Sequence, residues 1–484
     1  MARMTGVRYG EPAGRWVLLA TVLGSGMAFI DATVVNIALP RIGAPLGADA
    51  AALQWTVNGY TLPLAAFILL GGSLGDRFGR RRVFVIGVAW FAVASLLCGI
   101  APNTETLIAA RALQGVGGAL LTPGSLAILQ ASFSPDERSR AIGAWSGLGG
   151  IAGAAGPFLG GWIVSAASWR WVFLLNLPLA AVVIVAAMRH VPESFDPAAA
   201  RRIDGAGTLV GALGLAGVTY GFTAWPERGA TDPEVLGALA VGVAAMIGFI
   251  RIEQTSSHPM LPLDVFRSRA FSATNLVTFV VYGAIGGVFF FLVITLQVVA
   301  GFSPLAAGLA SLPVTVLMLL LSPRAGALAE RIGPRLPMSA GPLVCAVGVV
   351  LLAGIGPDTT YATDVLPGIL VFGLGLSLTV APLTATALAS AADSRAGIAS
   401  GVNNAVARAA GLMAVAVLPL VAGVGSSLVD AATLGPAHRT AMLICASLLA
   451  AGGLLALGTI PSSLAAVRPH PTPRAYVGPG CGTS

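Results

Sequence analysis

Long apolar runs, each able to cross a bilayer, are the feature that most limits how this chain can fold. A helix needs about 20 mainly apolar residues to span the hydrocarbon core. Suitable runs lie at 16–40, 53–75, 83–101, 107–130, 140–164, 169–188, 205–225, 234–252, 271–300, 303–323, 337–356, 363–391, 398–422 and 439–460. The chain is 56% hydrophobic and only 10% charged, which is outside the range of soluble domains. We therefore predict an all-α membrane protein with fourteen transmembrane helices.

The arginines between these runs predict the orientation of the chain. With both termini on one side, twenty-one arginines fall on that side, and only Arg41, Arg170, Arg228 and Arg439 fall on the other. Cytoplasmic loops of membrane proteins carry the excess of positive charge. We therefore expect both termini in the cytoplasm of a bacterial cell and a multi-pass protein of its plasma membrane. This orientation explains the net charge of +7, so no nucleic-acid partner is expected.

Cysteines and histidines give no sign of a metal site or a disulfide framework. Cys98, Cys345 and Cys445 lie inside apolar runs, and no CxxC pair is present. Loops or the tail are the expected positions of all four histidines: His190, His258, His438 and His470. The sequence has no HExxH motif. A membrane-embedded enzyme would need a catalytic set at membrane depth, so we expect neither an enzyme nor a metal site.

Three charged residues fall inside the predicted spans: Asp31, Arg111 and Arg408. All other acids can be placed in loops, tails or helix ends, so Asp31 is expected to be the only buried carboxylate. A charge at the bilayer centre costs from about 2.5 kcal/mol upward, so each of these residues is a functional candidate. Asp31 is the candidate proton site, and the sequence leaves open which arginine is its partner.

Polar and small residues share one face of the fourth run. Arg111, Gln114, Gly115, Gly118 and Thr122 follow helical spacing. Such a face is expected to point into the helix bundle rather than into lipid. An arginine satisfied by backbone carbonyls of a neighbouring helix is the structural alternative to a role in proton coupling.

A repeated motif divides the chain into two halves. The segments GGSLGDRFGRRR and GALAERIGPR both read G-x-L-x-(D/E)-R-x-G-x-R, and the second copy follows 254 residues after the first. A further pair of similar segments, at Ser139 and Ser394, argues against a chance match. We interpret the chain as six-helix halves at 1–188 and 271–460, a two-helix insertion at 189–270 and a disordered cytoplasmic tail at 461–484. Duplicated bundles of this kind place a substrate site between the halves and expose it alternately to each side.

The first copy of the motif is expected to form a gating loop. Its residues are Gly72, Asp76, Arg77, Gly79, Arg80 and Arg81. Asp76 is expected to pair with a cytoplasmic arginine, such as Arg138 or Arg140, in a latch that breaks when the conformation changes. A simple orientation signal is the alternative, but it does not explain an acid at a fixed place in both copies.

Glycines and a proline cluster in the fifth run, at Gly153, Gly156, Pro157, Gly160 and Gly161. A stripe of glycines permits close contact between helices. A proline removes a backbone hydrogen bond and favours a kink. Close packing alone is one interpretation, and a rocking contact between two helices is the one that we favour because of the proline.

Polar and aromatic residues of several spans are candidate substrate contacts. They are Asn36, Trp55, Asn58, Tyr60, Phe290, Gln297, Asn404 and Arg408. For Arg408, a structural role and a substrate contact stay equally open, because one sequence does not fix which helix face is inward.

Several segments resemble the major facilitator superfamily, in its branch of fourteen-helix drug:proton antiporters. The similarity is carried by FIDATVVNIALP, GGSLGDRFGRRR, RALQGVGGA, GAAGPFLGGWI, WRWVFLLNLP and GIASGVNNAVARAAG. It implies the major facilitator fold and export of hydrophobic or amphipathic compounds such as antibiotics, dyes or secondary metabolites. The proton gradient would drive export, with no cofactor. The resemblance further implies proton translocation by Asp31, support of coupling by Arg111, gating by the Asp76 loop, and an antiporter signature at Gly156 and Pro157.

One departure concerns the second half, where Pro334 replaces a basic residue of the motif. With no carboxylate in its spans, this half is expected to supply shape and substrate contacts, and one proton per cycle is expected. The expected partners are a small-molecule substrate, protons and the lipid bilayer, for a chain that works as a monomer. A proton-coupled importer is the nearest alternative. A receptor or scaffold is another, and it would tolerate Asp31→Asn.

Overall fold

The computed structural model describes residues 7–196, 204–256, 258–390, 396–424 and 427–463. Its first half contains α1 (Pro12–Leu46), α2 (Ala50–Phe78), α3 (Arg80–Gly99), α4 (Thr104–Ser132), α5 (Pro135–Ala166), α6 (Trp171–Leu174) and α7 (Asn176–His190). The hairpin α8 (Gly205–Arg228) and α9 (Pro233–Thr255) follows. The rest contains η1 (Leu263–Arg267), α10 (Arg269–Val298), α11 (Pro304–Ala310), α12 (Leu312–Ile332), α13 (Arg335–Leu352), η2 (Tyr361–Val365), α14 (Leu366–Ala389), α15 (Ala396–Val421) and α16 (Ala431–Thr459).

Thirteen helices among the described residues are long and apolar enough to cross a membrane. Two of these spans are each made of two consecutive α-helices, α6 with α7 and α11 with α12, and η2 opens the span of α14. Helix α5 has a shorter apolar stretch, Ala155–Ala166. The all-helical membrane architecture is therefore confirmed, and the count of fourteen spans stays a prediction.

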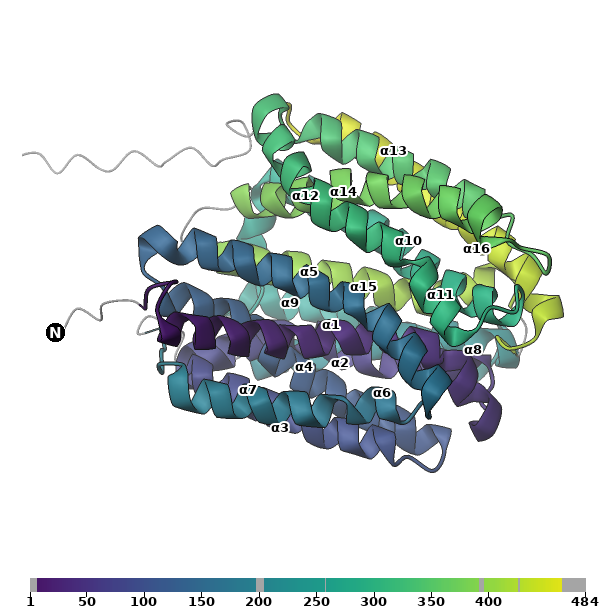
Figure 1. The fold of residues 1–484 in the computed structure, drawn as a ribbon, viewed down its shortest axis with the longest axis horizontal. Helices are drawn as coiled ribbons and strands as arrows, with labels where there is room; N and C mark the ends of the chain where they lie inside the picture. Colours follow the sequence, from purple (N-terminus) through teal and green to yellow (C-terminus); the bar gives the residue numbers. More distant parts are fainter. Residues whose placement is uncertain (1–6, 197–203, 257, 391–395, 425–426, 464–484) are drawn as a thin grey trace, which may run out of the picture.

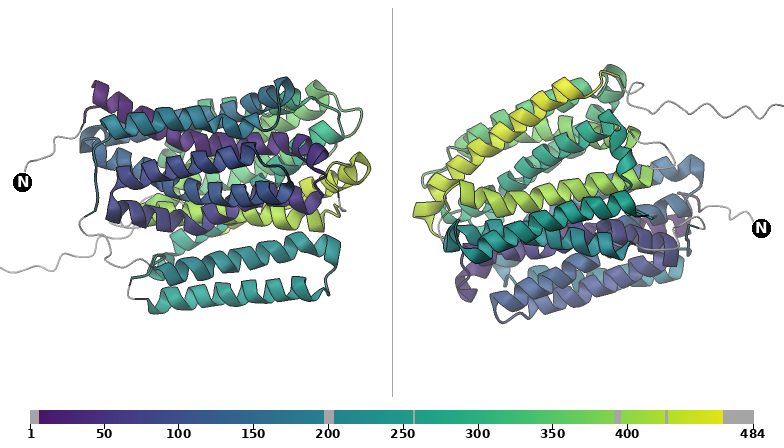
Figure 2. Two further views of the ribbon diagram at one scale, coloured as in Figure 1. Left: turned by 90° about the horizontal axis from the view of Figure 1, so that it is seen from below. Right: turned by 180° about the vertical axis from the view of Figure 1, so that it is seen from behind.

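The helices run side by side along the length of the molecule (Figure 1). Helix α1 begins and α16 ends at the same end of the bundle, here called the inner end, and the opposite end is the outer end (Figures 1 and 2). The hairpin of α8 and α9 lies at one side (Figure 2, left view). Helix α8 packs against α2 of the first half and α15 of the second, so the insertion touches both halves.

The two copies of the repeated motif fold alike. In each copy a helix ends just before the second glycine of the motif, which has positive φ: Gly79 at 108° and Gly333 at 87°. Each glycine lies against the segment that follows the last helix of its half, at Glu193 and at Ser462. The expected loop at 72–82 is wrong in extent, because α2 continues to Phe78 and α3 begins at Arg80. Of the other repeat, Ser394 lies outside the described residues.

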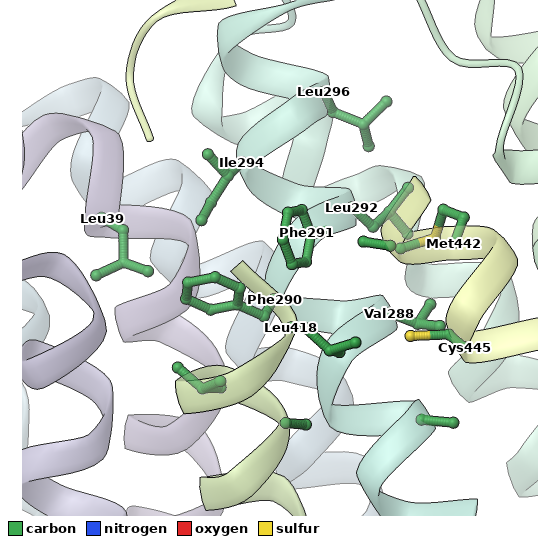
Figure 3. Close-up of a cluster of buried hydrophobic side chains, with 14 of the residues drawn as sticks. Leu39, Val288, Phe290, Phe291, Leu292, Ile294, Leu296, Leu418, Met442 and Cys445 are labelled. Atoms are coloured by element: carbon green, nitrogen blue, oxygen red, sulfur yellow. The ribbon is translucent and has the colours of Figure 1, made fainter. Parts of the chain in front are cut away.

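A large apolar core joins the halves at the outer end. Leu39 of α1 faces Phe290 and Ile294 of α10, and Leu418 of α15 and Met442 of α16 complete this part of the core (Figure 3). Lipid tails are as apolar as these side chains, so van der Waals packing rather than removal from water holds the helices together here. The halves are therefore packed together at the outer end.

Two predictions about buried polar residues are wrong. His438 does not lie in a loop, because α16 begins before the apolar run. Asp430 caps this helix by accepting a hydrogen bond from Ala432 N. The His438 side chain is fully buried. Asp31 is not the only buried carboxylate, because Glu253 near the end of α9 is 3% exposed. One Glu253 oxygen accepts a hydrogen bond from Leu261 N at 2.9 Å.

Candidate functional site

Asp31 and Arg111 form a buried ion pair between α1 and α4. Arg111 Nη1 donates to Asp31 Oδ2 at 2.5 Å. The Arg111 side chain is 1% exposed and the Asp31 side chain is 0% exposed. Of the two arginines that the sequence left open, the structure therefore pairs Asp31 with Arg111. Removing one partner of a buried ion pair typically costs about 3–5 kcal/mol, because the other charge is left uncompensated.

Two amide side chains hold the second oxygen of Asp31. Gln114 Nε2 donates to Asp31 Oδ1 at 2.8 Å, and Asn176 Nδ2 of α7 donates to the same oxygen at 3.4 Å. Both amide nitrogens also donate to Ser95 Oγ of α3, at 2.9 and 3.2 Å. The carboxylate is thus oriented by neutral groups from three helices in addition to its ion pair with Arg111.

The guanidinium of Arg111 has partners besides Asp31. Its Nε donates to Thr56 O of α2 at 3.0 Å, and its Nη1 also donates to Gln114 Oε1 at 2.6 Å. The cation lies over the Tyr60 ring, 4.4 Å from the centroid, which is a cation–π contact. The structural alternative for Arg111 is therefore true in part, since one backbone carbonyl does bind it. Because of these partners, the cation stays solvated by protein if Asp31 is neutralised.

Glycines of α4 allow this helix to pack closely on α2 beside the ion pair. A Cβ added to Gly115 would overlap Tyr60 O, and one added to Gly118 would lie 3.2 Å from the Tyr60 hydroxyl. The predicted polar and small face of the fourth run is therefore real, and it packs on α2. Asn176 and Ser95 were missed by the sequence reasoning. Asn176 is the only amide in its apolar run, which is a usable signal, whereas a serine inside a span is too common to be one.

The glycines of α5 pack against two neighbouring helices, α1 and α11. Added Cβ atoms at Gly156 and Gly160 would overlap or crowd Thr33 and Val34 of α1. A Cβ at Gly161 would lie 2.6 Å from Pro304 O of α11, in the other half.

Gly308 of α11 approaches the backbone of Pro157 still more closely, since an added Cβ would overlap Pro157 O. Gly153 differs, because no described atom lies within 4 Å of a Cβ added there. Helix α5 is therefore in close contact with both halves at the outer end.

The latch expected between Asp76 and Arg138 or Arg140 is not formed in this conformation, so it stays a prediction for the other one. Asp76 accepts a bond from Arg80 Nε at 2.8 Å, one turn further along the same motif, rather than pairing with Arg138 or Arg140. Arg140 instead lies over the Tyr9 ring.

The other motif residues have separate contacts. Arg81 lies 3.7 Å from a Glu193 carboxylate oxygen, which also ties the motif to the end of the half. The Arg77 guanidinium lies over the Phe78 ring, and Gly72 sits inside α2 near Pro123.

Half of the substrate candidates have structural partners. Tyr60 belongs to the surroundings of Arg111, as described above. Trp55 faces Tyr220 of the inserted α8, with ring centroids 6.4 Å apart. Phe290 is buried in the core between the halves (Figure 3). Gln297 of α10 donates to Ile37 O of α1 at 3.0 Å, so it links the halves directly.

The other candidates have side-chain atoms that stay available. Asn58 is fully buried, and neither its Nδ2 nor its Oδ1 has a partner among the described residues. Asn36 Oδ1 is likewise unpaired within the described ranges. Asn404 is exposed on α15 and donates only to Ser400 O. Arg408 is half-buried one turn further and forms no ion pair with any described residue.

Among the described residues, no group of three or more histidine, cysteine or acidic side chains could hold a metal ion.

Comparison with known sequences identifies the protein family of this chain. The model of the Major Facilitator Superfamily matches residues 21–416. The chain is 36% identical to the puromycin resistance protein pur8 of Streptomyces alboniger, over 85% of this chain and 82% of that protein. It is 35% identical to the tetracenomycin C resistance and export protein of Streptomyces glaucescens, over 83% and 74%.

Solved structures show the same fold at low identity. A POT family transporter in complex with a thioalcohol-conjugated peptide aligns with a TM-score of 0.71 at 14% identity, over 94% of this chain and 97% of that one. A D-xylose-proton symporter aligns with a TM-score of 0.65 at 15% identity, over 93% and 98%. At such identities the likeness concerns the fold alone.

Proposed function

The chain belongs to the Major Facilitator Superfamily, and from that premise we propose that it exports hydrophobic or amphipathic small molecules in exchange for protons. It is a multi-pass transporter of the plasma membrane. Relatives named for resistance to puromycin and for export of tetracenomycin C support export, with antibiotics as the first substrate class to test. The observation that carries proton coupling is the buried ion pair between Asp31 and Arg111.

The ion pair offers a place where one proton changes the packing of the first half. A nearby guanidinium and hydrogen bonds favour the charged carboxylate, whereas desolvation favours the neutral acid. Protonation at Asp31 Oδ2 would remove the attraction to Arg111, while Thr56 O, Gln114 and the Tyr60 ring keep the cation satisfied. The proton therefore loosens α1 from α4 and leaves a guanidinium that keeps its hydrogen bonds but has lost its counter-ion. One carboxylate in this site gives one proton per transport cycle.

Helix α1 connects this site to the contact between the halves. Ile37 lies six residues beyond Asp31, about 9 Å along the helix. Its carbonyl accepts the bond from Gln297, and Gly308 packs near its side chain. A shift of α1 relative to α4 therefore acts directly on contacts that hold the outer end closed. The halves also touch where Gly161 and Pro157 of α5 pack on α11. The halves rock about these two contacts, the one at α1 and the one at α5.

Alternating access follows from the two ends of the bundle. The halves are packed at the outer end, so the substrate enters from the inner end in this conformation. Protonation of Asp31 from outside then returns the transporter to this conformation after export. Arg408 is the best substrate contact, because it is half-buried and forms no ion pair with any described residue. Both termini lie in the cytoplasm, fourteen helices cross the membrane, and the monomer is the working unit.

Drug susceptibility of a host cell tests this function. The gene would be expressed in a bacterium that lacks its main efflux pumps, and growth would be measured against a panel of antibiotics and dyes. We expect resistance to at least one amphipathic compound, lost with Asp31→Asn at equal protein level in the membrane. Increased sensitivity would indicate the importer instead. Full resistance with Asp31→Asn would refute the assignment of the proton site.

A further inference from the structure

A groove on the outer surface of the second half runs between α13 and α16. It has a volume of about 400 Å³ and is lined by Val347, Val350, Leu351, Leu443, Ala446 and Ala450. A second groove of about 510 Å³ continues from it along α16, over Ile444 and Leu448. Val347 is 57% exposed and Leu443 is 45% exposed, so both grooves open toward the lipid that surrounds a membrane transporter.

The groove offers no free hydrogen-bond donor to an occupant. Its two hydroxyl groups donate within their own helix, Ser447 Oγ to Leu443 O at 2.8 Å and Thr440 Oγ1 to Pro436 O at 3.2 Å. All other lining side chains are apolar. An occupant of the groove therefore has to be apolar along this length.

A positive charge stands at the outer mouth of the groove. Arg439 is exposed and forms no ion pair within the described part of the chain. Residues at i, i+4, i+7 and i+11 share one face of a helix, so Arg439 lies directly outward of Leu443, Ala446 and Ala450. Arginine near a helix end in a membrane extends its guanidinium to the level of the headgroups. The charge and the apolar channel are thus aligned.

The dimensions fit one leaflet of a bilayer. Eleven residues of helix separate Arg439 from Ala450, which is about 16 Å. Half of a hydrocarbon core of about 30 Å is about 15 Å. An acyl chain attached to a headgroup at Arg439 would therefore end where the groove ends.

Two contacts hold the walls of the groove in place. At the outer end, His438 Nε2 donates to Leu352 O of α13 at 3.0 Å. Toward the inner end, an added Cβ at Gly453 would lie 2.7 Å from Ser339 O of α13, so the backbones touch there. With α13 and α16 fixed at both ends, the groove exists before an occupant arrives, which reduces the entropic cost of binding.

We propose that this groove binds one acyl chain of a bilayer glycerophospholipid whose phosphate pairs with Arg439. The site lies on the lipid side of the second half, apart from the ion pair of the first half, and does not depend on the transported compound. A bound lipid would fasten α13 to α16 and stabilise the second half against the motions of the transport cycle.

Lipid titration with native mass spectrometry tests the site. Purified transporter in detergent would be titrated with dioleoyl phosphatidylglycerol, dioleoyl phosphatidylethanolamine and dioleoylglycerol, which lacks the phosphate. Both phospholipids should bind, and dioleoylglycerol should bind more weakly. Arg439→Gln should weaken phospholipid binding about fivefold, the value for one basic residue near anionic groups. Arg439→Lys should retain binding, and Ala450→Phe should reduce it with the charge intact.

A matched control and two contrary outcomes complete the design. Arg41 is also exposed near the outer end of its helix but lines neither groove, so Arg41→Gln should bind lipid like the unchanged protein. Thermal unfolding in lipid-free detergent would verify that every variant is folded. Equal lipid binding by Arg439→Gln, Ala450→Phe and the unchanged protein would overturn the proposal. So would a dimer that Ala450→Phe dissociates, because a second copy of the chain would then be the occupant.

Discussion

Replacing Gly161 with alanine is expected to open the outer end of the transporter. The added Cβ would lie 2.6 Å from Pro304 O, whereas ordinary contact begins at 3.4 Å, so α5 and α11 must separate by about 0.8 Å, the difference between these distances. The obstructing atom belongs to the backbone and has no rotamer that avoids the overlap. Overpacking of this kind costs about 1–3 kcal/mol. The cost falls on the conformation in which the halves touch, so the population open at the outer end should rise about 5- to 150-fold.

Distances between spin labels measure this change. Labels at Arg41 of α1 and Ala432 of α16, both exposed at the outer end, would report the separation of the halves in a background without native cysteines. Gly153→Ala is the matched control on the same helix, because no atom of the described residues lies within 4 Å of its added Cβ. It has the same gain in helix propensity, about 0.5–1 kcal/mol, without the overlap. Identical distance distributions for Gly161→Ala and Gly153→Ala would refute the reasoning.

Three other substitutions test separate parts of the account. Asn176→Ala removes one long hydrogen bond, from a neutral amide to the Asp31 carboxylate, and should reduce proton-coupled transport about 2- to 10-fold, measured as initial rates in vesicles. His438→Leu removes one of two donors to the Leu352 carbonyl and leaves the buried Thr295 hydroxyl without its partner, so it should lower the free energy of unfolding by about 1–3 kcal/mol. This is seen as a lower midpoint of thermal unfolding in detergent, and an unchanged midpoint would contradict these bonds. Gly79→Ala forces a side chain into a backbone with φ of 108° and should cost about 1–3 kcal/mol in the same assay.

The buried ion pair could be found from the sequence because its signal is chemical. Aspartate and arginine are expensive inside a bilayer, so their presence in apolar runs already required a partner and a purpose. The choice between Arg111 and Arg408 could not be made, since it depends on which helices are neighbours. Asn176 and Ser95 were missed for the same reason: small polar residues are tolerated in spans, and only packing shows that these two surround Asp31.

Helix ends and the packing of one helix beside another were the other features that the sequence did not predict. An apolar run marks the hydrocarbon stretch, whereas a helix continues until its caps, so His438 and the first motif were placed in loops although both are helical. In this conformation Asp76 pairs with the nearby Arg80, and the latch to Arg138 or Arg140 stays a prediction for the other conformation. The neighbour of Trp55, Tyr220 of the inserted hairpin, could not be predicted, because the position of the hairpin against α2 leaves no trace in the local sequence.

Proton movement in response to substrate tests the central claim most directly. The purified transporter would be reconstituted into liposomes that contain a pH-sensitive dye, and an exported compound identified by the susceptibility screen would be added. We expect the unchanged protein to move protons on addition of that compound. Asp31→Asn, which keeps the size of the side chain and leaves Arg111 in place, should still exchange labelled for unlabelled compound but move no protons. Proton movement at the unchanged rate in Asp31→Asn would contradict the account.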